Sequence, residues 1–146
     1  MTADLVFPAA NALALGGWLL LAAFPRRRAV TAAICGAAIP ALLSALYLCL
    51  LVSRAGHAQG GFGSLAGVRA LFEDPWLLLA GWVHYLAFDL FIGAWEARDA
   101  QRRGVSRWAL LPCLALTFLV GPVGLLCWLG ARRLFGREPL RAPSPS

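Results

Sequence analysis

Long apolar runs separated by short polar segments dominate the pattern of this chain. Four runs are each long enough to cross about 30 Å of hydrocarbon as a helix, which takes about 20 residues. They cover residues 5–24, 29–52, 75–97 and 107–130. Because backbone groups in lipid must be paired and none of these runs alternates like a strand, we expect helices. The pattern therefore predicts an all-α polytopic membrane protein, a compact four-helix transmembrane bundle.

The segments between the runs are of two kinds. Residues 25–28 and 98–106 are short and rich in arginine, whereas residues 53–74 are longer and rich in glycine. Within this longer segment we expect a short interfacial helix near 65–72. Asp74 can cap the helix that follows it, because a carboxylate accepts hydrogen bonds from the free N–H groups of a first turn.

Composition supports the membrane assignment. Hydrophobic residues make up 60% of the 146 residues and charged residues only 14%, with a mean hydropathy of +0.72. A soluble domain of this size cannot bury so much apolar surface. We expect one transmembrane domain over residues 1–131 and a basic, disordered tail at 132–146. The arginines follow the first apolar run, which is typical of a retained span and not of a cleaved signal peptide.

The positive charge is carried entirely by arginine, and the net charge is +6. The arginines gather at the ends of the apolar runs, which favours contact with lipid headgroups over contact with nucleic acid. The arginine-rich, alanine-rich composition suggests a bacterial protein, and hence the inner membrane. Short basic loops stay cytoplasmic, so we expect both termini outside. A fourth run broken at Gly121-Pro122 and re-entering would bring the basic tail to the cytoplasmic side, but the sequence does not demand it.

The second run carries small residues at regular spacing. Ala33, Ala37, Ala41 and Ala45 recur every four residues, so they share one helix face. Small side chains let two helices approach closely in a membrane. We therefore expect a neighbouring helix to pack on this face.

The third run contains ionisable residues near its centre, in the stretch WVHYLAFDLF at 82–91. His84 and Asp89 each lie within about 4 Å of the midpoint along the helix axis. Ionisable groups at this depth are costly and usually face the bundle interior. Five residues correspond to a rotation of about 140°, so these two do not share a face. Glu96, seven residues after Asp89, shares its face and is a weaker candidate, since it is also interpretable as a boundary charge.

Other polar side chains in the runs are candidates for binding, namely Asn11, Ser44, Tyr47, Trp82, Tyr85 and Thr117. Interhelical hydrogen bonds that serve packing alone are the alternative for each of them. The four cysteines all lie in apolar runs without a C-x-x-C pair, and the chain has only two histidines. These features predict no metal site and no cofactor.

Three short motifs carry a resemblance to a known family. They are W-V-H at 82–84, D-L-F at 89–91 and P-V-G-L-L at 122–126. In order and separation, the stretch from Leu78 to Leu126 resembles the neoxanthin-synthase-like membrane proteins, named for an abscisic-acid-deficient plant mutant. The first two runs match this family only in character. In plants, the resemblance implies a small plastid-envelope protein with about four spans.

The resemblance also implies an activity, the conversion of violaxanthin to neoxanthin. This isomerisation opens an epoxide and removes a proton to form an allene, so it needs an acid and a base but no redox partner. His84 and Asp89 are the ionisable residues at the matching positions. The implied catalytic residues are therefore His84 and Asp89, and the implied ligand is a carotenoid or a similar apolar lipid.

Two functions of different class remain open on the sequence. One is an isomerase acting on a carotenoid or another long apolar lipid. The other is a non-enzymatic membrane protein that binds pigment or lipid, or that organises partner membrane proteins. A transporter is disfavoured, because the chain has no repeat pair. The expected partners are membrane lipid and an apolar ligand, without nucleic acid, and an oligomer is compatible with this pattern.

Overall fold

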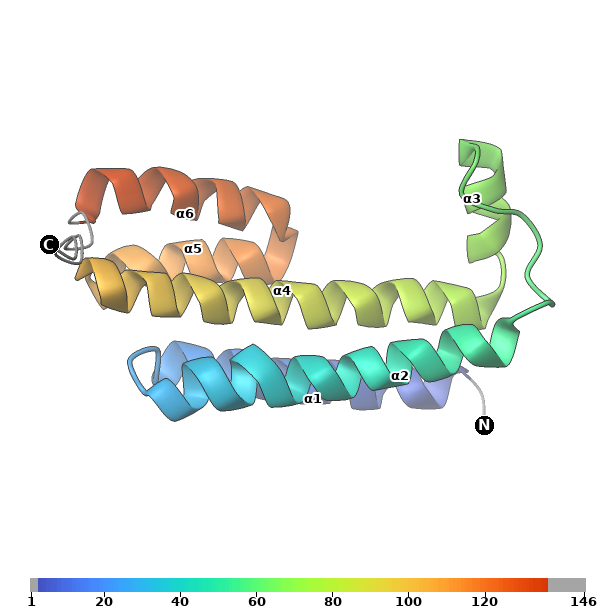
Figure 1. Ribbon diagram of the computed structural model, residues 1–146, viewed down its shortest axis with the longest axis horizontal. Helices are drawn as coiled ribbons and strands as arrows, with labels where there is room; N and C mark the ends of the chain where they lie inside the picture. The colour runs from blue at the N-terminus through green and yellow to red at the C-terminus, as the bar shows by residue number, and fades with distance from the viewer. Residues whose placement is uncertain (1–2, 137–146) are drawn as a thin grey trace, which may run out of the picture.

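The computed structural model describes residues 3–136, and the regular elements of this part of the chain are all helices (Figure 1). In chain order they are α1 (Ala3–Ala23), η1 (Ala29–Ala38), α2 (Ile39–Arg54), α3 (Leu65–Phe72), α4 (Pro75–Arg103), α5 (Arg107–Val120) and α6 (Pro122–Phe135). The predicted all-α class is confirmed, as is the short helix expected near 65–72. Three helices are long and apolar enough to cross a membrane: α1, the continuous η1–α2 and α4.

The central element is α4, which contacts every other helix of the described chain. Leu90, Ala94 and Ala97 on this helix are fully buried. Small residues bring α1 close to it: a Cβ built at Gly17 would lie 2.7 Å from a Leu90 methyl group, and Gly93 faces the Trp18 ring. Packing around α4 therefore holds the bundle together, and it gives side chains on different faces of α4 different neighbours.

The second span begins as a π-helix and becomes α-helical at Ile39, one residue before Pro40. Proline has no N–H and its ring crowds the carbonyl four residues earlier, so it disfavours regular α-helical hydrogen bonds in the turn before it. The N–H of Ile39 instead bonds to the carbonyl of Ile34, five residues back. The Cys35 thiol donates to the Gly17 carbonyl at 3.2 Å and ties this stretch to α1.

The segment at 107–130 is not one helix, and this corrects the expected fourth span. Two helices of 14 residues each, α5 and α6, meet at Gly121 and fold back as a hairpin. Gly121 has a φ of +33°, a conformation that side chains other than glycine rarely adopt, and Pro122 starts α6. Fourteen residues rise only about 21 Å, which is too short to cross about 30 Å of hydrocarbon. The hairpin therefore enters the bundle and returns to the end where it began.

This return also corrects the expected placement of both termini on one side. Gly136, after the end of α6, lies beside Arg103 at the end of α4, whereas α1 begins at the opposite end (Figure 1). One end of the described bundle thus gathers Arg26, Arg27, Arg28, Arg98, Arg102, Arg103, Arg107, Arg132 and Arg133. We call this the arginine end. Helix α6 includes residues 132–135 of the predicted tail, and residues 137–146 lie outside the described part.

The prediction that a neighbouring helix packs on the alanine face of the second span is wrong. Ala33, Ala37, Ala41 and Ala45 are all exposed in the structure, as is Ser44. Helices α1 and α4 instead cover the face that carries Cys35, which is fully buried. Small residues permit close approach, but they do not by themselves determine which face a neighbour occupies.

At the end opposite the arginines, Asp74 holds the start of α4. Its carboxylate accepts hydrogen bonds from the N–H groups of Trp76 and Leu77, at 2.8 and 3.3 Å, and pairs with Arg54 at the end of α2. Burial alone would raise the pKa of Asp74, but the hydrogen bonds from Trp76, Arg54 and Leu77 together lower it below 3.8. The predicted helix cap is confirmed, and it also joins two spans.

A lowered aspartate pKa makes the stability of this junction depend on pH. The ionised Asp74 stabilises the folded state fully at pH values above 3.8, the ordinary pKa of an aspartate. This stabilisation is lost as the pH falls through the lower pKa of Asp74 in the folded protein. Asp74→Asn keeps a capping side chain but removes the ion pair. We expect this variant to unfold at a lower temperature than the parent at pH 7, and the difference to shrink as the pH falls below 3.8 and through the lower folded pKa. Thermal unfolding in detergent across this pH range measures it, and a difference independent of pH would contradict the ion-pair account.

Candidate functional site

One face of α4 lies open between two structures that stand on the same side of it. Helix α3 covers it near its start and the α5–α6 hairpin covers it from its middle onward, while no described helix lies over the stretch between (Figure 1). Leu78, Trp82 and Phe88 on this stretch are 56%, 40% and 56% exposed. We call this stretch the notch; it is formed by Leu78, Gly81, Trp82, His84, Tyr85 and Phe88. Of these residues, Leu78, Trp82, His84 and Phe88 are exposed, so His84 does not face the bundle interior as expected for an ionisable group at this depth.

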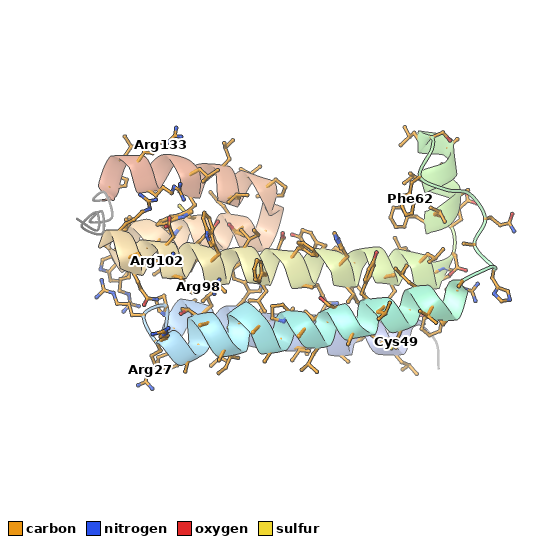
Figure 2. The ribbon with its side chains drawn as sticks, viewed as in Figure 1. Arg27, Cys49, Phe62, Arg98, Arg102 and Arg133 are labelled. Atoms are coloured by element: carbon orange, nitrogen blue, oxygen red, sulfur yellow. The ribbon has the colours of Figure 1, made fainter. Side chains whose placement is uncertain are left out.

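A cavity of about 320 Å³ opens into the notch where α2, α3 and α4 meet. Its lining is apolar apart from the Tyr47 hydroxyl and the His84 imidazole, and Phe62 beside α3 borders it (Figure 2). The His84 ring lies between two aromatic rings, with centroid distances of 4.5 Å to Phe88 and 5.6 Å to Tyr47. Gly81 makes room for α3, since a Cβ there would lie 2.9 Å from the Phe72 ring. This edge of the notch combines an apolar hollow with two groups that exchange protons.

The opposite edge of the notch is tied to α1. The Trp82 indole N–H donates to Asn11 Oδ1 at 3.1 Å, and the Asn11 amide donates to the Phe7 carbonyl at 2.8 Å. Trp82 also stacks against Tyr85, with ring centroids 5.4 Å apart. Asn11 and Trp82 are thus engaged with each other, and they bind α1 to α4 along the border of the open face.

The hairpin tip ends the notch near the middle of the membrane. The Tyr85 hydroxyl donates to the Phe118 carbonyl at 3.3 Å. Asp89, about 4.5 Å past Leu86 along the helix axis, faces the turn. A Cβ built at Gly121 would lie 2.8 and 2.9 Å from the two Asp89 carboxylate oxygens, so only glycine leaves space for them. Asp89 Oδ2 is buried without a hydrogen-bond partner among the described residues.

A second carboxyl group lies deeper under the hairpin. Glu96 is fully buried, and its Oε1 accepts a hydrogen bond of 2.9 Å from the equally buried Thr117 hydroxyl. Its Oε2 has no partner within residues 3–136. Beyond it, Asp99 pairs with Arg103 at 3.0 Å and with Arg132 at 3.2 Å. Carboxyl groups on this side of α4 therefore extend from mid-membrane to the arginine end.

The structure divides the predicted site residues among different faces. His84 and Tyr47 share the cavity, and Asn11 and Trp82 share the α1 border. Tyr85, Asp89 and Glu96 lie against the hairpin, which itself carries Thr117. Asp89 is not among the residues that line the His84 cavity, although both border the notch. Ser44 lies on the exposed face of α2 and joins no group.

Sequence reasoning gave Glu96 too little weight by interpreting it as a boundary charge. The signal for its burial was its seven-residue spacing from Asp89, which places both on one helix face. The spacing could not predict which segment covers Glu96, because the hairpin that buries it comes from residues 107–135, distant in the sequence. No group of three or more His, Cys, Asp or Glu side chains in the described residues is arranged to hold a metal ion.

The chain matches a known protein family over most of its length. A family model described as ABA DEFICIENT 4-like matches residues 5–128. The chain belongs to the ABA4-like family. Within the matched residues, Trp82 and His84 border the notch and Asp89 lies at its end. Searches of curated proteins and of solved structures returned no match to this ABA4-like chain.

Proposed function

We propose that this ABA4-like membrane protein is an isomerase, without net redox change, that acts on a carotenoid or a similar long apolar lipid lying in the notch. The observation that carries the proposal is the hairpin that stops at mid-membrane. It leaves the open face of α4 bordered by His84 with Tyr47 on one edge and by Asp89 with Tyr85 at the hairpin tip. A molecule within the bilayer reaches this face sideways, without leaving the hydrocarbon.

The chemistry requires one acid and one base. The acid donates a proton to the epoxide oxygen as a C–O bond breaks, and the base removes a proton from carbon as the new double bond forms, so nothing is oxidised or reduced. Protonated Asp89 can serve as the acid and neutral His84 as the base. The reverse assignment uses the same two positions. Either way the substrate gains one proton at oxygen and loses one at carbon, and a proton must pass from the base back to the acid before the next turnover.

The separation of the two residues suits action on different atoms. His84 and Asp89 are five residues apart, about 7.5 Å along the axis and about 140° around it. They are therefore not a hydrogen-bonded pair along α4. A long molecule that crosses the face between them can meet one group at an oxygen atom and the other at a carbon atom. The aromatic side chains of Tyr85 and Phe88 lie on the face between them.

The test uses the full chain in liposomes that contain violaxanthin, with neoxanthin measured by chromatography. The parent is expected to convert the substrate. His84→Gln and Asp89→Asn should each lower the rate at least a hundredfold, as loss of a general acid or base does. The chain offers matched controls in His57→Gln and Asp4→Asn, since both residues are exposed and neither forms the notch or lines its cavity. Folding of each variant is checked by its elution as a single species and by circular dichroism.

The outcomes separate the two function classes. Normal conversion by both His84→Gln and Asp89→Asn would make the catalytic assignment wrong. Retention of violaxanthin by the parent without conversion would instead support a non-enzymatic protein that binds pigment or lipid. The mainly apolar lining of the 320 Å³ cavity favours that second candidate, because an apolar hollow binds such molecules whether or not chemistry follows.

For localisation, we propose the bacterial inner membrane with the arginine end in the cytoplasm. Nine arginines of the described chain lie at that end, whereas Arg54 and Arg69 lie at the other. Short loops rich in arginine are retained on the cytoplasmic side. The N-terminus then lies outside, and the notch lies in the outer half of the bilayer.

A further inference from the structure

A second cavity lies at the arginine end, away from the notch. Its volume is about 360 Å³, and it lies between η1 and the end of α4. Three arginines line it, Arg28 before η1 and Arg98 and Arg102 on α4, together with Thr31, Ala32 and Gln101. Figure 2 shows Arg98 and Arg102 on α4. We call this hollow the arginine cavity.

Specific contacts hold the arginine cavity in place. The Arg98 guanidinium donates to the backbone carbonyl of Thr31 in the π-helical part of the second span. Gly36 is required for this contact, because a Cβ at that position would collide with the guanidinium. Gln101 donates to the Pro25 carbonyl at 2.7 Å and joins α4 to the preceding loop. Arg98 is thus fixed across the helix interface, while Arg102, one turn further along α4, is exposed.

These three arginines carry charge that no carboxylate of the described residues neutralises. Within residues 3–136, Arg28, Arg98 and Arg102 pair with no carboxylate, whereas Arg103 and Arg132 share Asp99. The three positive charges around this cavity repel each other. An anion with several oxygen atoms would relieve that repulsion and could accept charge-assisted hydrogen bonds from more than one guanidinium.

An aromatic strip leads from the cavity toward the middle of the membrane, partly buried at Trp95 beside the Arg132 guanidinium and exposed beyond it. Trp95, Phe91 and Phe88 follow Arg98 along the same side of α4 at spacings of three and four residues. Phe91 is 44% exposed and Phe88 is 56% exposed. Arg98 and Phe88 are ten residues apart, or about 15 Å along the helix, which is half of a hydrocarbon core about 30 Å thick. The strip therefore spans the depth of one leaflet.

We propose that the arginine cavity binds the phosphate headgroup of an anionic phospholipid from the arginine-side leaflet, with one acyl chain along Trp95, Phe91 and Phe88. A free phosphate would use only the cavity, and a neutral lipid would use only the strip. An anionic phospholipid uses both, at the separation that a leaflet imposes. Basic pockets between membrane helices on the cytoplasmic side bind such headgroups. The headgroup site in the arginine cavity is separate from the notch, which the acyl chain reaches only at Phe88, and it does not depend on the isomerase proposal.

The test measures the thermal unfolding midpoint of the full chain in detergent. Dioleoyl phosphatidylglycerol, dioleoyl phosphatidylcholine and inorganic phosphate are titrated separately over the same concentrations. Phosphatidylglycerol is expected to raise the midpoint in a saturable manner, because it binds the folded state only. Phosphatidylcholine and phosphate should each raise it far less at equal concentration. An equal effect of phosphatidylcholine, or an equal effect of inorganic phosphate, would overturn the proposal.

Variants separate a site from general charge attraction. Arg102→Gln should weaken apparent phosphatidylglycerol affinity about fivefold, and the exposed position allows the chain to fold. Arg133→Gln is its matched control, because Arg133 is also exposed but lies on α6 away from the cavity (Figure 2). Phe91→Ala should weaken phosphatidylglycerol binding without creating a response to phosphate. Equal losses for Arg102→Gln and Arg133→Gln, or no loss for both Arg102→Gln and Phe91→Ala, would overturn the proposal.

Discussion

Cysteines introduced at Gly61 and at Arg133 are expected to react with a membrane-impermeant maleimide from opposite sides of the membrane. Gly61 lies in the segment between α2 and α3, and Arg133 lies near the end of α6. The hairpin returns α6 to the arginine end, where Arg132 pairs with Asp99 at 3.2 Å. A continuous fourth span would instead have placed residue 133 on the same side as residue 61, so the expected difference is all or none.

The experiment uses intact cells and the Cys49→Ala, Cys127→Ala background, because these two native cysteines are exposed whereas Cys35 and Cys113 are buried. Gly61→Cys should be labelled in intact cells. Arg133→Cys should be labelled only after the membrane is opened, as should Arg102→Cys, which marks the end of α4. If Arg133→Cys and Gly61→Cys were labelled together while Arg102→Cys was protected, the hairpin would have to cross the membrane.

Gly124→Ala is expected to destabilise the protein by about 1–3 kcal/mol, the usual cost of forcing an extra group into a packed site. Gly124 on α6 packs directly against Thr117 on α5, and a Cβ there would enter the space of the Thr117 backbone nitrogen and hydroxyl. Neither atom can move freely, since the backbone belongs to a helix and the hydroxyl bonds to buried Glu96. The substitution thus disturbs the hairpin and the Glu96 contact together.

The matched control for this substitution is Gly130→Ala on the same helix. No atom lies within 4 Å of a Cβ built at Gly130, so alanine fits there without contact. Replacing a glycine inside a helix by alanine favours folding by about 0.5–1 kcal/mol. Reversible unfolding in mixed micelles with increasing dodecyl sulfate measures both changes. Equal stability of the Gly124→Ala and Gly130→Ala variants would mean that α5 and α6 do not pack as described.

The spans and their starting points could be predicted because their causes are local. Twenty apolar residues cannot remain in water, and their backbone groups must pair within a helix in lipid. The start of α4 follows from Asp74 and Pro75, whose capping and φ preferences need no distant partner. The shared face of Asp89 and Glu96, and the separation of Asp89 from His84, follow from helical geometry alone.

The exposure of the alanine face and of Ser44 could not be predicted from local sequence. Small residues on one face make close packing possible, but the position of a neighbour depends on all the helices together. In the structure, α1 and α4 pack on the other side of the second span, where Cys35 donates to the Gly17 carbonyl. The alanine face and Ser44 therefore remain exposed, although both were compatible with packing in the sequence.

The sequence by itself determined an all-α membrane protein, its first three spans and the positions of the ionisable residues along the third of them. Only the tertiary structure decided the path of the last segment. Gly121 and Pro122 are compatible both with a kinked span and with a reversal, because local conformational preference does not specify what the following helix contacts. Packing of Gly124 on Thr117 and the pairing of Arg132 with Asp99 hold the reversed path. That path buries Glu96, places the turn at Asp89 and leaves the face of α4 beside His84 open.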